Sequence, residues 1–142
     1  MSDSIVIGLH NRYRYATLFR MRVHWGSLPD GVVLVIGLAG LPKGTGRVDR
    51  AAAKLLPATI DGGCGRQVAL DPTHIYRPMP DKDRCSDLPE ILIPAAQSVF
   101  AAIRIQTPAT LPPGPPPQFD VMQLEDGRVI GGCTIQITAP LA

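Results

Sequence analysis

The sequence has few of the residues that cross-link small proteins or bind metals. Its 142 residues include three cysteines and three histidines. Cys64, Cys85 and Cys133 are odd in number and lie far apart, without a C-x-x-C pair, so we expect no disulfide scaffold. Four zinc ligands at a suitable spacing are also missing. We therefore expect no metal and no cofactor.

The chain also lacks a long hydrophobic run. Its most apolar stretch, VVLVIGLAGL at residues 32–41, is about half of the ~20 residues that a membrane-spanning helix needs. The first residues alternate between polar and apolar and then become arginine-rich, which differs from a secretory signal. We expect no membrane association and a cytoplasmic location.

Motifs for catalysis are scarce. There is no G-x-S-x-G turn for a nucleophilic serine, and PKGTG at residues 42–46 lacks the G-x-x-x-x-G-K-[ST] pattern that holds nucleotide phosphates. We expect that the chain binds no GTP and is not an enzyme. The remaining catalytic alternative is a small enzyme built around Asp71, His74 and Cys64, although Asp71 before Pro72 also fits an ordinary turn.

A strongly basic character is absent as well. The net charge is +2, which by itself does not indicate nucleic-acid binding. Four arginines do cluster near the start of the chain, at positions 12, 14, 20 and 22. We interpret them as solvated side chains of a half-exposed strand, and contact with phosphate or an acidic surface is the alternative.

Glycine and proline, by contrast, are abundant. The 14 glycines and 15 prolines, with a hydrophobic fraction of 45%, predict an all-β globular chain of many short strands around one core. In residues 17–23, TLFRMRV, Phe19, Met21 and Val23 share one parity and Leu18 shares the other with two arginines, which predicts a strand with one buried face. Strands are expected at residues 5–9, 15–25, 32–38, 67–70, 75–76, 99–105, 119–124 and 129–137.

The clearest local signal lies near the end of the chain. LEDGRVIGGCTIQI, at residues 124–137, places Asp126-Gly127 between two alternating apolar runs, a strong indication of a β-hairpin. Gly131 or Gly132 permits a bulge or a close approach of strands. Residues 81–87 are expected to form a polar loop.

Three short motifs occur in the order of a known domain. They are GGCGR at residues 62–66, YRP at 76–78 and LEDGRVIGG at 124–132. In this order they resemble the C-terminal β-barrel, domain 3, of translation elongation factor Tu and its elongation factor 1-alpha relatives. The resemblance covers residues 48–138, and it departs from the family where Gln67 stands in place of a histidine.

The resemblance implies a small closed antiparallel β-barrel of about six strands, Greek-key-like, at residues 48–142. Residues 1–47 would form an N-terminal β extension. The resemblance also makes residues 48–56 the first barrel strand, although Ala51-Ala52-Ala53 favours a helical turn by propensity alone.

The same resemblance implies a function without catalysis. In the family this barrel contacts tRNA backbone and partner proteins, and the matching positions here are Arg66, Gln67, Arg77 and Arg128. The resemblance does not extend to the family's nucleotide-binding domain, and we expect none. We therefore expect a stand-alone protein-interaction module with an unidentified protein partner, and the alternative is a module that binds tRNA or other RNA.

Overall fold

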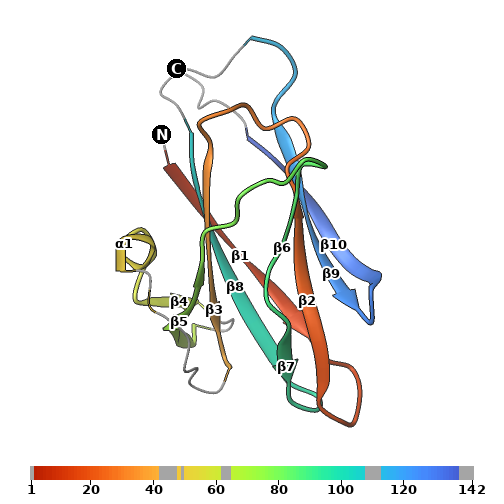
Figure 1. Cartoon of the computed structure of the whole chain (residues 1–142). Coiled ribbons are helices and arrows are strands. Elements are labelled where there is room, and N and C mark those ends of the chain that lie inside the picture. The colour runs from red at the N-terminus through yellow and green to blue at the C-terminus, as the bar shows by residue number, and fades with distance from the viewer. Residues whose placement is uncertain (1, 42–47, 49, 62–64, 108–112, 138–142) are drawn as a thin grey trace.

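A computed structural model describes residues 2–41, 48, 50–61, 65–107 and 113–137 of the chain. The elements are β1 (Ser2–His10), β2 (Thr17–His24), β3 (Val33–Ala39), α1 (Arg50–Ala53), β4 (Thr59–Asp61), β5 (Gln67–Tyr76), β6 (Cys85–Asp87), β7 (Ile91–Ile93), β8 (Ser98–Gln106), β9 (Gln118–Glu125) and β10 (Arg128–Gln136) (Figure 1). Residues 42–46 and Cys64, discussed above, lie outside the described part.

The strands form two antiparallel sheets. Sheet 1 has the order β1-β8-β3-β5-β4, and sheet 2 has the order β10-β9-β2-β6, with β7 also pairing with β2. The predicted all-β class and antiparallel pairing are confirmed. Where the resemblance implied about six strands in a closed barrel, the described residues form ten strands in two sheets. In Figure 1 the helix, β4 and β5 lie on one flank and the β9–β10 hairpin lies on the other.

Strands from the first 47 residues are interleaved with later strands. β1 pairs with β8, β3 lies between β8 and β5, and β2 lies between β9 and β6. The segment expected to be an N-terminal extension therefore shares both sheets, and the main hydrophobic core, with the segment at residues 48–142.

The main core lies between the two sheets. In β2, Phe19, Met21 and Val23 are buried while the intervening residues are not, which confirms the one-sided strand predicted from the alternation. Side chains from β3 and β8 complete this core, among them Leu34, Ile36, Val99 and Ile103.

A second hydrophobic cluster covers the outer face of sheet 1. Val35, Ala39 and Ala102 on the sheet contact Ala52 and Leu56 from the helical segment, with Ile60 and Ile75 beside them. Because both faces of β3 are covered, nearly the whole strand is buried. This explains the continuous apolar sequence of residues 32–41.

The same cluster corrects one expectation. Residues 48–56 were predicted to be a barrel strand, but Arg50–Ala53 form α1 and only Thr59–Asp61 form a strand. The alanines have high helix propensity, and a short helix lets Ala52 and Leu56 pack on the sheet together. Leu56 fits because Gly37 has no side chain: a Cβ at Gly37 would lie 2.7 Å from Leu56 Cδ1.

β5 is one strand where two were expected. It runs from Gln67 to Tyr76, and the register jumps from Ala39↔Leu70 to Gly37↔Ile75. Residues 71–74, DPTH, therefore bulge from the ladder, which accommodates Pro72 without loss of a ladder hydrogen bond. The strand ends before Arg77-Pro78, as predicted.

The hairpin between β9 and β10 confirms the prediction from Asp126-Gly127. These two residues have φ of 52° and 77°, as a two-residue type I′ turn requires. The register shifts between Val129 and Gly131, so a bulge is present where the glycines indicated one.

The polar segment at residues 81–87 is a loop only in its first part, because Cys85–Asp87 form β6 and pair with β2. The Asp81 carboxylate accepts hydrogen bonds from the backbone N–H groups of Asp83 and Cys85, at 2.8 and 2.9 Å. Arg84 completes this turn with φ of 59°. Its guanidinium donates to the carbonyls of Gly26 and Leu28, at 3.0 and 2.7 Å, and so joins the loop to the segment after β2.

Candidate functional site

The residues carried over from the family resemblance are dispersed. Arg66 directly precedes β5 and Arg77 directly follows it. A strand rises by ~3.3 Å per residue, and the bulge at residues 71–74 shortens β5, so the two arginines are roughly 25 Å apart. Gln67 starts β5, where its side-chain carbonyl accepts a hydrogen bond from the Thr59 hydroxyl at 3.3 Å. Arg128 starts β10 in the other sheet. The structure does not bring these four residues into one site.

The pair considered for catalysis does come together. His74 Nε2 lies 3.8 Å from Asp71 Oδ2, and His74 Nδ1 lies 3.1 Å from the Tyr76 hydroxyl. The Thr73 backbone N–H and hydroxyl both donate to Asp71 Oδ1. Burial, with the nearby Asp71 charge, raises the pKa of Tyr76, which does not favour a tyrosine nucleophile. The contacts stabilise the DPTH bulge.

Within the described ranges, no group of three or more side chains is arranged to hold a metal ion. No helix in this part of the chain is long and apolar enough to cross a membrane.

A groove of about 600 Å³ lies on the outer face of sheet 2, where the β9–β10 hairpin ends beside β2. The last residue pair between β2 and β9 is Arg20↔Leu124, and β9 then leads into the turn at Asp126-Gly127. β2 continues past this point toward Thr17, and its other edge pairs with β7. The groove therefore begins where the pairing of β9 with β2 ends.

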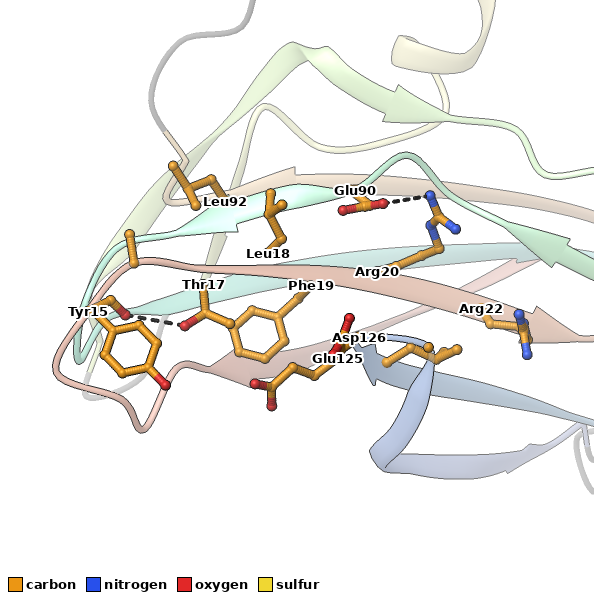
Figure 2. Close-up of a pocket in the computed structure, with 13 residues that line it drawn as sticks. Tyr15, Thr17, Leu18, Phe19, Arg20, Arg22, Glu90, Leu92, Glu125 and Asp126 are labelled. Carbon is orange, nitrogen blue, oxygen red and sulfur yellow. Dashed lines mark hydrogen bonds and ion pairs between the residues drawn. The ribbon is translucent and has the colours of Figure 1, made fainter.

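Two leucines form the exposed apolar part of the groove. Leu18 of β2 and Leu92 of β7 are directly opposite each other in the ladder, so their side chains share one face. They are 52% and 53% exposed, and Figure 2 shows them side by side. Leu124, paired with Arg20 and buried, also lines the groove.

Ion pairs lie at the end of the groove that Arg20 and Arg22 line. Arg20 lies 3.1 Å from Glu90 (Figure 2). Arg22 Nε and a terminal guanidinium nitrogen donate to the two oxygens of Asp87 at 2.6 and 3.1 Å. The hydrogen bond from Arg22 lowers the pKa of Asp87, and the same bond raises the pKa of Arg22. Both arginine charges are thus already compensated by carboxylates.

Tyrosines and carboxylates lie at the other end of the groove, beside the β9–β10 turn. The rings of Tyr13 and Tyr15 stack with centroids 5.3 Å apart, and the Tyr13 hydroxyl donates to Glu125 at 2.9 Å. This hydrogen bond to a carboxylate raises the pKa of Tyr13. Glu125 and Asp126 line the groove on the hairpin side, so the charged residues that line this end are both acidic.

The sequence held one signal for this groove. Leu18 occupies the same parity as Arg20 and Arg22, the parity that faces solvent. A single apolar residue on the solvent-facing side of a strand does not indicate a binding surface unless a second one lies beside it. The pairing of Leu18 with Leu92, 74 positions away, could not be predicted from the sequence. Glu125 was noted in the family motif, without a role.

Comparisons with models of known protein families, with curated proteins and with solved structures return no match for this chain.

Proposed function

We propose that this chain is a non-catalytic protein-interaction module that binds an extended peptide segment in the groove at the outer end of sheet 2. The observation that carries the proposal is the pair of opposed, half-exposed leucines, Leu18 and Leu92, in a groove of about 600 Å³. Adjacent exposed apolar side chains in a depression with a polar rim are typical of protein-binding surfaces.

The charges of the groove indicate the chemistry of the partner. Arg20 and Arg22 are paired with Glu90 and Asp87, while Glu125 and Asp126 at the other end form no ion pair with another residue of the described part of the chain. A bound segment with an apolar side chain over the leucines and a lysine or arginine next to it would complement both features.

The leucines set the scale of the binding energy. Full burial of a leucine side chain contributes about 1.5–3 kcal/mol, so covering the exposed half of each contributes about 1 kcal/mol. Together they account for roughly 2 kcal/mol, or about a 30-fold effect on the dissociation constant. We therefore expect a single substitution of either leucine to weaken binding about fivefold or more.

RNA binding is the less supported alternative. It would use Arg66, Arg77 and the N-terminal arginines, and phosphate contacts confer affinity collectively. Arg20 and Arg22 are engaged with carboxylates, and Arg66 and Arg77 lie at opposite ends of β5.

The experiment is selection from a displayed library of random peptides on the folded protein. We expect an enriched pattern of one apolar residue beside lysine or arginine, with binding lost in Leu18→Lys and kept in Val6→Lys. Val6 is an exposed apolar residue of β1, so Val6→Lys controls for added charge. Selected peptides that bind Leu18→Lys as well as the unmodified protein, or a pattern rich in acidic residues, would refute the proposal.

A further inference from the structure

The last strand of sheet 2 has an open edge. β10 is nine residues long and pairs with β9 on one side, and no described strand pairs with its other side. Val129 and Ile130 are 56% and 43% exposed, and the remaining β10 side chains are exposed or half-buried. An unpaired strand of this length presents a row of backbone donors and acceptors to solvent.

The direction of these backbone groups follows from one hydrogen bond. The Ile137 N–H donates to the Pro117 carbonyl at 2.8 Å, toward the β9 side. Backbone groups of a strand alternate in direction, so those of Ile135 and Cys133 also point to β9. The N–H and C=O groups of Gly132, Thr134 and Gln136 therefore point to the open edge.

From Gly131 onward, β10 lacks the features by which most edge strands avoid pairing, because its bulge lies between Val129 and Gly131. The edge strands β4 and β6 are only three residues long. In β10 the only charged residue is Arg128, at its first position, and there is no proline. Short length, charge, proline and a bulge are the usual protections of an edge.

We propose that β10 pairs antiparallel with β10 of a second copy of this chain, across a twofold axis at Cys133. In this register Thr134 of one copy faces Gly132 of the other, so residues whose backbone groups point outward bond to each other. Ile135 faces Gly131 as a non-hydrogen-bonded pair, because the backbone groups of both residues point to β9. The absence of side chains on the two glycines leaves room for the larger partners. Uncharged residues face each other throughout this central part.

The register fixes the position of Cys133 in the dimer. It lies on the axis as a non-hydrogen-bonded pair with Cys133 of the second copy, where Cα atoms are ~4.5 Å apart, within the range that a disulfide spans. A strand edge alone is smaller than the ~800 Å² per partner of a stable interface. We therefore expect a dimer whose population rises with protein concentration.

The first test compares Thr134→Pro with Thr134→Ala by sedimentation. Proline removes the central outward N–H, whereas alanine keeps it, and both lose the hydrogen bond from the Thr134 hydroxyl to Asp120. We expect the unmodified protein and Thr134→Ala to double in mass at high concentration and Thr134→Pro to remain monomeric with an unchanged circular dichroism spectrum. A folded Thr134→Pro variant that still dimerises, or an unmodified protein that stays monomeric, overturns the proposal.

A second test needs no proline. In a chain carrying Cys64→Ser and Cys85→Ser, added diamide oxidises pairs of thiols, which lose two protons and two electrons to the reagent. We expect rapid formation of the covalent dimer through Cys133. In the matched control, which also carries Cys133→Ser and Thr134→Cys, the thiol is off the axis and on the other face, so cross-linking should be lost or much slower. Equal rates in the two chains overturn the register.

Discussion

The link between Arg84 and the segment after β2 is the contact whose loss we expect to destabilise the fold most measurably. The Arg84 guanidinium donates to the carbonyls of Gly26 and Leu28 at 3.0 and 2.7 Å. Hydrogen bonds from a charged donor contribute about 1.5–3 kcal/mol each. Since both bonds are only partly buried, we expect Arg84→Ala to lower the free energy of unfolding by roughly 2–3 kcal/mol in total.

The backbone at this residue supplies a comparison that separates two effects. Arg84 has φ of 59°, a left-handed conformation that costs a residue with a side chain about 1–2 kcal/mol and costs glycine almost nothing. Arg84→Gly loses the same hydrogen bonds as Arg84→Ala but removes this cost. We expect Arg84→Gly to be about 1 kcal/mol more stable than Arg84→Ala. Arg84→Lys should recover little, because one ammonium group replaces a planar fork.

Urea denaturation followed by circular dichroism measures these differences. With a slope of about 2 kcal/mol per molar urea, Arg84→Ala should lower the midpoint by about 1–1.5 M. Two results would refute the reasoning. A urea midpoint for Arg84→Ala equal to that of the unmodified protein would mean that the two hydrogen bonds contribute nothing. A midpoint for Arg84→Gly lower than that for Arg84→Ala would mean that the turn stores no strain.

Two further predictions concern β10 and the ion pairs. A Cβ at Gly132, where φ is 156°, would lie 2.5 Å from the Val121 carbonyl oxygen, so Gly132→Ala should lower stability by about 2 kcal/mol. A Cβ at Gly131 would have nothing within 4 Å, so Gly131→Ala should change the melting temperature little. Equal effects of the two substitutions would contradict this account of the close approach at Gly132. The Arg22 guanidinium lowers the folded-state pKa of Asp87, so the pair stabilises the fold above the unfolded-state value of about 3.9 and this contribution is lost as pH falls through the lower folded-state pKa. Asp87→Asn should flatten the decline in stability below about pH 4, and an unchanged pH profile would show that the pair contributes nothing.

The sequence predicted features that depend on near neighbours. The β9–β10 hairpin followed from Asp126-Gly127, because the required φ values are available to few other residue pairs. The buried face of β2 followed from the alternation of Phe19, Met21 and Val23, since strand side chains alternate with a period of two. Each of these signals lies within a few residues of the structure that it predicts.

Features that depend on distant contacts were missed. The family resemblance assigned residues 48–56 to a strand, whereas local propensity favoured the helix that forms. The packing of Ala52 and Leu56 on sheet 1 decides between the two. The groove arises from the pairing of β2 with both β7 and β9. Leu18 and Leu92 are informative only as neighbours, and pairing across such sequence separations is set by the topology.

The central claim is that the groove beside Leu18 and Leu92 binds an apolar and basic peptide segment, and chemical-shift mapping on the ¹⁵N-labelled protein tests it most directly. We predict that a peptide enriched in the selection will shift the backbone amides of Leu18, Leu92 and Gly127, and that a version with its basic residue changed to glutamate will do so only at higher concentration. The same sample titrated with tRNA at low salt should show no change there. Shifts confined to the surroundings of Arg66 and Arg77, with either the peptide or tRNA, would contradict the account.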